Sequence, residues 1–266
     1  MNFAMMMNLE PHGPDTFVGI GPKYPWGGLY GGQIVAQALR AATLTVEPHF
    51  RVHSLHAYFI RRGDHEEPIR FEVDRIRNGR SFVTRSVVAR QPIGAILNLS
   101  ASFQVDEPAP DMQIAVPPPV PQPDALAGTN WMAMFERRFA PRADEKGRAV
   151  AWLRMVDEVG DDPAMNACAL AYMSDDLPTD AVVALLYPER VAGEWDGPHS
   201  FWTASLDHAI WFHRPLRVDD WQLQEFTCHG LISSRGLSVG HVFDTEGVHL
   251  ATISQEVLLR ELRTDS

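Results

Sequence analysis

A hydroxyl and a carboxylate lie two residues apart in the stretch ASLDHAIWFHRP, at Ser205 and Asp207. His208 follows directly, and an aspartate beside a histidine is a common source of acid–base catalysis. The alternation of the stretch is that of a β-strand, however, on which the adjacent residues Asp207 and His208 point to opposite faces. They therefore cannot form a simple acid–base pair. We expect a structural role for both, within the strand or against a helix.

Other polar residues that could do chemistry have ordinary structural explanations when each is considered alone. Asp175 follows a predicted helix, where a carboxylate commonly accepts bonds from backbone amides. Ser205 and Gln255 would each be a polar side chain on a strand. His213 and Arg214 end a strand, which suits a capped strand end as well as a contact with ligand phosphates.

The elements of the first half are those of an α+β fold. A loop rich in Gly and Pro leads into a predicted helix over 32–46, whose apolar residues recur at three- and four-residue steps. Asn78-Gly79 favours a β-hairpin. Runs of β-branched and aromatic residues predict strands at Thr16–Ile20, Phe50–Ile60, Ile69–Arg75, Ser81–Arg90 and Ile93–Val105. One helix followed by a meander of strands predicts an antiparallel sheet with a helix on one face.

The second half repeats this plan. We expect helices at Pro163–Met173, entered through Asp161 and Asp162, and at Thr179–Tyr187 after a kink near Pro178. Strands are predicted at Trp131–Phe139, Val150–Val156, Ser200–Phe212, Trp221–Gly230, Leu237–Phe243 and Val248–Leu259.

Short matches between the halves indicate a duplication. HAYFIRR, which begins at His56, is similar to HAIWFHR, which begins at His208, an offset of 152 residues. Gln104 matches Gln255 at an offset of 151. Near-constant offsets on separate strands favour a repeated module over two unrelated α+β halves.

A proline-rich segment divides the chain. Seven of the seventeen residues of Glu107–Pro123 are proline, and polyproline geometry cannot continue a sheet. We therefore predict an N-terminal module at 1–106, a linker at 107–124 and a C-terminal module at 125–266. The first residues, MNFAMMMNLEPHG, lack the basic region and the cleavage site of a signal peptide, so we expect a frayed start.

Composition limits the classes of function. With 266 residues, of which 45% are hydrophobic, the chain can form one large domain or two modest ones. A net charge of −11 argues against bulk binding of nucleic acid or of anionic membranes. No apolar run approaches the ~18 residues that a membrane span requires. Cys168 and Cys228 lack metal-site spacing, and we expect reduced thiols in a cytoplasmic protein.

These features resemble the type II acyl-CoA thioesterases, which consist of two fused hot dog modules. The matching segments are GGLYGGQIVAQAL (27–39), VHSLHAYFIRRGD (52–64), RNGRSF (77–82), ASFQ (101–104), LAYMSD (170–175), ASLDHAIWFHRP (204–215) and ISQEVLLR (253–260). The similarity runs in order along nearly the whole chain. It implies a double hot dog, in which two antiparallel sheets, each wrapped around a central helix, pack side by side.

The resemblance implies hydrolysis of a fatty acyl-CoA thioester to fatty acid and coenzyme A, with no cofactor, no metal and no covalent intermediate. Members of the family hold and activate one water with an Asp, a Ser or Thr, and a Gln. Carried over by motif, these are Asp175 of LAYMSD, Ser205 of ASLDH and Gln255 of SQE. Asp176 directly follows Asp175, so the motif locates the carboxylate in the sequence but identifies Asp175 less firmly.

The implied chemistry sets requirements on these residues. An aspartate with its ordinary pKa of about 3.9 is a poor general base unless burial raises that pKa toward neutrality. Ser205 and Gln255 can each donate and accept, so they can fix the orientation of a water. The oxyanion needs donors, which backbone N–H groups at a helix start commonly supply. We expect these near 163–173, with Gly31 and Gly32 serving the first module if it were active.

The first module has no matching catalytic set. The offset of 152 places His53 opposite Ser205 and Leu55 opposite Asp207. We therefore expect one working site per chain. Exposed edges of hot dog sheets usually pair, so we also expect a homo-oligomer, a dimer or a tetramer.

Two other functions fit parts of the pattern. An enoyl-CoA hydratase or dehydratase with the double hot dog fold uses an Asp–His dyad, but 175–180 contains no histidine. A non-catalytic acyl-CoA-binding module would keep the fold, although retention of all three polar residues argues against it. Arginines 61, 62, 80 and 235 are candidates for contacts with coenzyme A phosphates, and solvated surface arginines are the alternative.

Overall fold

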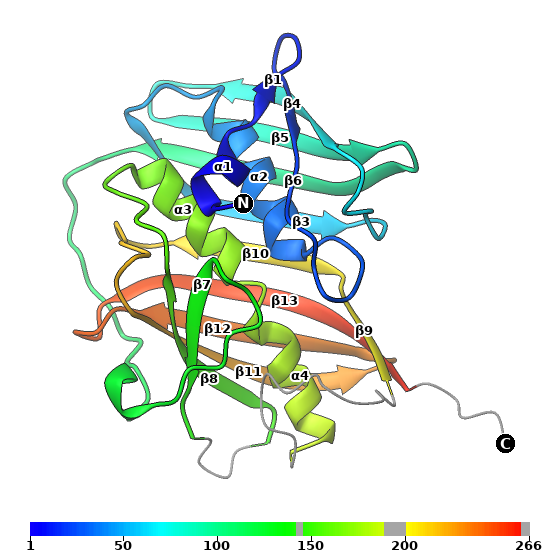
Figure 1. The fold of residues 1–266 in the computed structure, drawn as a ribbon. Helices are drawn as coiled ribbons and strands as arrows, with labels where there is room; N and C mark the ends of the chain where they lie inside the picture. The colour runs from blue at the N-terminus through cyan, green and yellow to red at the C-terminus, as the bar shows by residue number, and fades with distance from the viewer. Residues whose placement is uncertain (142–145, 189–200, 262–266) are drawn as a thin grey trace, which may run out of the picture.

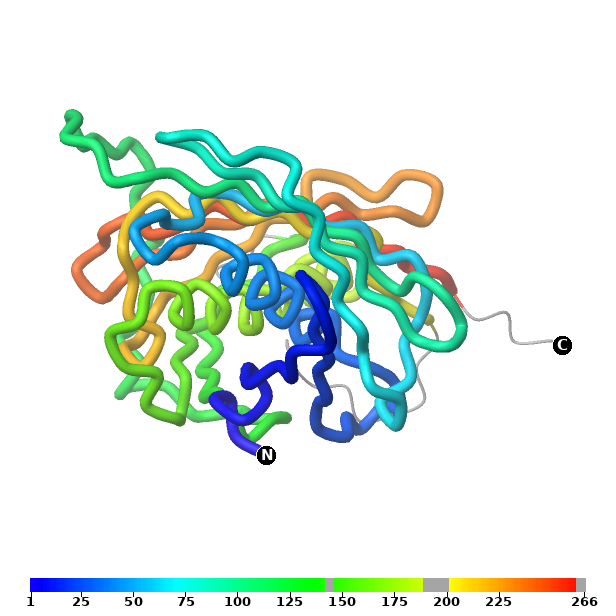
Figure 2. Tube along the Cα trace, turned by 90° about the horizontal axis from the view of Figure 1, so that it is seen from above, coloured from blue at the N-terminus to red at the C-terminus, as the bar shows by residue number. Residues whose placement is uncertain are grey.

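The two halves of the chain contribute to one continuous antiparallel sheet. The computed structural model describes residues 1–141, 146–188 and 201–261. Within them, thirteen strands form a single sheet, and the central helices lie on one of its faces (Figures 1 and 2). The strand order is β1-β2-β4-β5-β6-β3-β10-β13-β12-β11-β8-β7, and β9 also pairs with β13.

The first half has the expected helix and strands. The helices are α1 (Phe3–Met7) and α2 (Gly31–Thr43), and the strands are β1 (Glu10–Pro11), β2 (Thr16–Gly19), β3 (Phe50–Phe59), β4 (Ile69–Asn78), β5 (Phe82–Gln91) and β6 (Gly94–Val105). Helix α2 ends three residues earlier than predicted. The chain between β6 and the 3-10 helix η1 (Pro123–Ala125) forms neither helix nor strand.

The second half follows the same plan with two helices. The helices are α3 (Pro163–Met173) and α4 (Leu177–Leu186), and the strands are β7 (Phe135–Phe139), β8 (Arg148–Met155), β9 (Phe201–Ser205), β10 (Asp207–Phe212), β11 (Gln222–Ile232), β12 (Arg235–Phe243) and β13 (His249–Glu261). The predicted bounds of α3 are confirmed, and Asp162 caps it by accepting a hydrogen bond from the N–H of Ala164 at 2.9 Å.

The strand predicted at Ser200–Phe212 is broken into β9 and β10, and Ser200 lies outside the described residues. Both pieces pair with β13, Ser205 opposite Val257 and Phe212 opposite Ala251. At the break, Leu206 donates its N–H to Glu256 and accepts at its carbonyl from Phe59 of β3. The break therefore lies where the chain passes from β9, which pairs with β13, to β10, which lies between β3 and β13.

The N-terminus is not frayed, and that prediction is wrong. Residues 3–7 form helix α1, in which Phe3 and Met6 are buried. The Phe3 ring lies 5.9 Å from that of Tyr172 in α3, and its N–H donates to Asp157. The apolar start of the chain therefore packs as part of the core, because its side chains cover helices that would otherwise be exposed to water.

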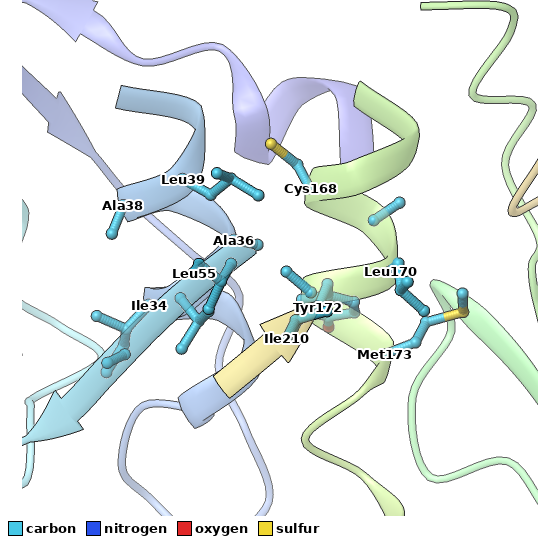
Figure 3. Packing of buried hydrophobic residues seen from close by; sticks show 14 of the residues in the cluster. Ile34, Ala36, Ala38, Leu39, Leu55, Cys168, Leu170, Tyr172, Met173 and Ile210 are labelled. Carbon is cyan, nitrogen blue, oxygen red and sulfur yellow. The ribbon is translucent and has the colours of Figure 1, made fainter. Parts of the chain in front are cut away.

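The core forms where the helices meet each other and the sheet. Helix α2 packs on strands of the first half and on α3, and α4 packs on strands of the second half. Figure 3 shows Leu39 of α2 and Cys168 of α3 among the buried side chains between the two helices. A β-carbon at Gly32 would lie 2.2 Å from the carbonyl oxygen of Tyr172, so glycine is required for this close approach.

The burial pattern corrects the offset between the halves by one residue. In β3, Leu55 and Ala57 are buried and Tyr58 is exposed. In β10, His208 and Ile210 are fully buried, Ala209 between them is 9% exposed, and Trp211 is exposed. A shift of one residue moves a strand side chain to the other face of the sheet. His208 therefore corresponds to Leu55 at an offset of 153, and not to His56.

The match of Gln104 with Gln255 is also wrong. Ile253 pairs with Ile210, and at the corresponding place in the first half Leu99 pairs with Ala57. Gln255 lies two residues beyond Ile253, so its counterpart is Ala101, which lies two residues beyond Leu99.

No helix of the described chain has both the length and the apolar character needed to cross a membrane.

Candidate active site

Asp175 lies at the junction of the two halves. It follows α3 directly and precedes α4, and only 7% of it is exposed. Its Oδ2 accepts a hydrogen bond from the backbone N–H of Gly32 at 2.9 Å. Gly32 lies in the first turn of α2, where N–H groups have no partner within the helix and the helix dipole favours a negative charge. The carboxylate therefore occupies an anion-binding position.

The three side chains assigned by motif meet in one hydrogen-bonded line. Ser205 ends β9, and its hydroxyl donates to Asp175 Oδ1 at 3.0 Å. Gln255, fully buried in β13, donates from Nε2 to the oxygen of Ser205 at 2.8 Å. Residues 30 and 50 positions apart in the chain are thus brought into contact. The arrangement can orient a small polar molecule beside a carboxylate.

Burial raises the pKa of Asp175 to about 6, because desolvation disfavours the charged form. The hydrogen bonds from Ser205 and Gly32 act in the opposite direction by stabilising the carboxylate. A carboxyl group with this pKa is ionised at neutral pH and is far more basic than an ordinary aspartate. This is the property that a general base at this position requires.

Asp176 has a different environment from its neighbour. Both of its oxygens accept hydrogen bonds from Nη1 of Arg137, at 2.9 and 2.8 Å, and Oδ1 also accepts from Nε1 of Trp131 at 2.6 Å. The side chains of Arg137 and Asp176 are 2% and 4% exposed. Asp176 is therefore held in a buried ion pair, whereas Asp175 accepts from the amide of Gly32 and the hydroxyl of Ser205. Of the two carboxylates that the motif left open, Asp175 is the candidate base.

A cluster of aromatic rings lies beside the turn that carries Asp175 and Asp176. Tyr30 directly precedes α2, and its ring centroid lies 5.2 Å from those of Trp131 and Tyr172. Trp131 also donates to Asp176, and Tyr24 and Tyr172 are buried. The spacing of these aromatics in the sequence gives no sign that they would gather here.

His208, for which the sequence predicted a structural role, also contacts the candidate site. It is fully buried, with Nδ1 at 2.5 Å from Gln255 Oε1 and Nε2 at 2.9 Å from the hydroxyl of Ser174. Burial lowers its pKa to about 4, so the ring is neutral at neutral pH. Asp207 on the opposite face accepts the N–H of Glu256 at 2.6 Å. As predicted, Asp207 and His208 do not form an acid–base pair. The contact of His208 with Gln255 could not be inferred from the sequence.

Oxyanion donors near 163–173 for the second module, with Gly31 and Gly32 serving the first module if it were active, stay a prediction. The N–H of Gly32, from the first half, donates to the carboxylate of Asp175 in the second half. A β-carbon at Gly31 would meet Asp175 Oδ2 at 2.5 Å, so α2 begins directly against this side chain.

Three of the four candidate phosphate-binding arginines have partners within the protein. Arg61 and Arg62 donate to the carbonyls of Ala95 and Trp26, and Arg235 pairs with Glu256. Among the described residues, no group of three or more His, Cys, Asp or Glu side chains is placed to hold a metal ion.

Two family models match the chain. Residues 21–104 match the acyl-CoA thioesterase N-terminal domain, and residues 113–259 match the acyl-CoA thioesterase C-terminal domain. The chain is 32% identical to acyl-coenzyme A thioesterase 8 of Homo sapiens, over 96% of this chain and 88% of that protein. It is 30% identical to acyl-CoA thioesterase 2 of Haemophilus influenzae, over 97% of each.

Solved structures agree with these matches. The acyl-CoA thioesterase II TesB2 from Mycobacterium marinum superposes with a TM-score of 0.85 at 34% identity, over 98% of each chain. A conserved protein with a hot dog fold from Alicyclobacillus acidocaldarius superposes with a TM-score of 0.83 at 21% identity, over 98% of each chain, and this likeness shows the fold alone. The chain has a hot dog fold and belongs to the acyl-CoA thioesterase family.

Proposed function

We propose that this protein hydrolyses fatty acyl-CoA thioesters to free fatty acid and coenzyme A, with one water activated by Asp175 and oriented by Ser205 and Gln255. The observation that carries the proposal is the line of hydrogen bonds from Gln255 through Ser205 to Asp175. It ends on a buried carboxylate whose pKa is raised to about 6. Membership of the thioesterase family supports the choice of substrate.

The proposed reaction uses these side chains, one water and the backbone at the start of α2. Asp175 takes a proton from the water as its oxygen attacks the thioester carbonyl carbon, which gives a tetrahedral oxyanion. At the start of α2 the N–H of Gly32 donates to Asp175, and those of Gln33 and Ile34 donate to the carbonyl of Tyr30. We assign the stabilisation of the oxyanion to the N–H of Gly31, which has no hydrogen-bond partner among the described residues. The C–S bond then breaks, and the proton held by Asp175 passes to the sulfur of coenzyme A.

We further propose that the fold is a double hot dog, with modules at 1–106 and 125–266 joined by a linker at 107–124, and with one site per chain. The places of His208 and Gln255 are held in the first half by Leu55 and Ala101, which cannot form hydrogen bonds through their side chains. The first half therefore supplies the start of α2 to the site and lacks a polar set of its own.

An assay for free thiol with palmitoyl-CoA and shorter acyl-CoA substrates tests the function. The wild-type protein should release one thiol per thioester, and Asp175→Asn should lower kcat by about 10² to 10⁴. If no substrate of any chain length releases thiol, the proposal is overturned. Binding without release would favour an acyl-CoA-binding module, and hydration of enoyl-CoA without thiol release would favour a hydratase.

We also propose that the protein is a dimer or tetramer assembled through the sheet face opposite the helices. Large apolar side chains on this face are exposed to solvent, among them Tyr58, Trp202, Trp211 and Leu237. Contact with a second copy would remove their apolar area from water. A molar mass of one chain, measured by light scattering at micromolar concentration, would overturn this assignment.

We propose a cytoplasmic enzyme of lipid metabolism, and the two cysteines support the cytoplasmic location. Cys168 and Cys228 are free and buried, and free thiols are typical of a reducing compartment. Cell fractionation tests this location.

A further inference from the structure

The fully buried imidazole of His208 connects the end of α3 with the proposed catalytic residues. Its Nε2 lies 2.9 Å from the hydroxyl of Ser174, the residue that precedes Asp175. Its Nδ1 lies 2.5 Å from Oε1 of Gln255. The ring is therefore at the far end of the line of hydrogen bonds that reaches Asp175 through Ser205.

The ionised carboxylate fixes the direction of every bond in this line. A carboxylate only accepts, so the hydroxyl of Ser205 must donate to Asp175. The oxygen of Ser205 then accepts from an N–H of Gln255, which turns the carbonyl oxygen of Gln255 toward His208. That oxygen also only accepts, so Nδ1 of His208 must carry the proton. Nε2 of the neutral ring is then an acceptor. The hydroxyl of Ser174 has two acceptors in reach, this Nε2 at 2.9 Å and the carbonyl oxygen of Ala171 at 3.2 Å, and we assign its proton to the shorter contact.

We propose that His208 is a positioning residue for hydrolysis: its Nδ1–H holds Gln255 in the one orientation in which the amide N–H groups face Ser205 and the attacking water. This inference rests on the proposed role of Gln255. Without the Nδ1–H donor, the amide can turn over and present its oxygen to Ser205. The hydroxyl of Ser205 would then be drawn away from Asp175, and the water would lose a fixed partner. Ser174 acts on His208 and not directly on Gln255. Its hydroxyl donates to Nε2 and so keeps the ring in the tautomer that carries the proton on Nδ1.

The first half supplies an internal comparison. Leu55 occupies the place of His208, and Ala101, which pairs with Leu55, occupies that of Gln255. A leucine thus fits the same position of the fold beneath the helices. The imidazole and the amide occur together in the second half and are absent together from the first, as expected if one serves to orient the other.

Kinetics of His208→Leu test the inference. We expect kcat to fall by roughly 10²-fold with little change in KM, since the loss is one of orientation. His208→Asn, which can place an amide N–H near the position of Nδ1, should recover part of the loss. In a Gln255→Ala background, His208→Leu should cause no further loss, because His208 acts through Gln255. An equal loss in both backgrounds, or a kcat for His208→Leu equal to that of wild type, would overturn the proposal.

Ser174 and Ser238 form a matched pair of buried serines. Ser238 lies opposite Gln255 in the register of β12 and β13, and its hydroxyl has no hydrogen-bond partner among the described residues. Ser174→Ala should lower kcat several-fold, whereas Ser238→Ala should leave it unchanged. Equal activities of the two variants would contradict the role of Ser174 in holding the tautomer.

A measurement independent of activity separates this inference from the proposed function. Imidazole ¹⁵N NMR of the wild-type protein, assigned with His208→Asn, should show His208 protonated at Nδ1 and bare at Nε2 at neutral pH. Thiol release that is absent from wild type would defeat the proposed function, and the NMR spectrum would then decide the inference alone. A ring protonated at Nε2 would overturn it.

Discussion

Gly32 and Asp175 are 143 residues apart in the chain, yet the N–H of Gly32 donates to Oδ2 of Asp175 at 2.9 Å. One belongs to the first turn of α2 in the first half, and the other lies between α3 and α4 in the second. The proposed base is therefore held by both halves, although its polar partners Ser205 and Gln255 come from the second alone. The first half is a structural part of the site.

The rate of hydrolysis should follow the ionisation of Asp175. The folded-state pKa of this group is about 6, raised from 3.8 by burial, and only the ionised form can take a proton from water. We expect kcat to rise about tenfold per pH unit below pH 6 and to level off above it. Loss of thioester absorbance, measured from pH 4.5 to 8, gives the profile. A rate that is constant through pH 6 would remove Asp175 as the base.

The same shift predicts how stability changes with pH. Because the folded state holds the proton of Asp175 more tightly than the unfolded chain, this group lowers the free energy of unfolding as pH rises from about 4 through about 6. At pH 7 the cost is roughly 3 kcal/mol. Asp175→Asn should therefore be more stable than wild type at pH 7, and the difference should shrink toward pH 4. Urea unfolding at several pH values checks this, and a difference that does not depend on pH would contradict it.

Asp176→Asn should damage stability, in contrast to Asp175→Asn. It leaves the buried guanidinium of Arg137 without its carboxylate, which costs about 3–5 kcal/mol. The double variant Asp176→Asn with Arg137→Met should regain much of that loss, because the unpaired charge is gone. Urea unfolding of the three proteins tests the pair. Equal stability of Asp176→Asn and wild type would show that the ion pair does not hold the turn.

Gly31→Ala should impair catalysis more than folding. The added methyl group would lie 2.5 Å from Asp175 Oδ2 and 3.0 Å from the ring of Phe59, so the carboxylate must move. A displacement of this size should lower kcat by roughly 10²-fold. Gly230→Ala is the control, since a β-carbon there meets nothing within 4 Å. Equal kcat values for the two variants would show that the carboxylate tolerates displacement.

The sequence by itself predicted the elements of the fold and the three motif residues. Helix α3 was predicted to the residue, and most strands to within a few residues, because the period of apolar side chains is a local property. The break at Leu206 was missed, since it depends on bonds to Phe59 and Glu256 from other strands. The start of the chain was misjudged because five residues of helix are held only by tertiary packing.

Only the tertiary structure decided which residues cooperate. Asp175 and Asp176 are adjacent in the sequence, and the buried ion pair of Arg137 with Asp176 distinguishes Asp176 from the proposed base, Asp175. His208 contacts Gln255, which is 47 residues away in the chain. Burial of His208 shows which face of the sheet its side chain occupies, and this corrected the alignment of the two halves by one residue. Local patterns specify helices and strands, whereas desolvation and hydrogen-bond partners depend on chain segments that meet only in the folded protein. The sequence therefore determined the class of chemistry, and the fold determined the carboxylate, its pKa and the orientation of its partners.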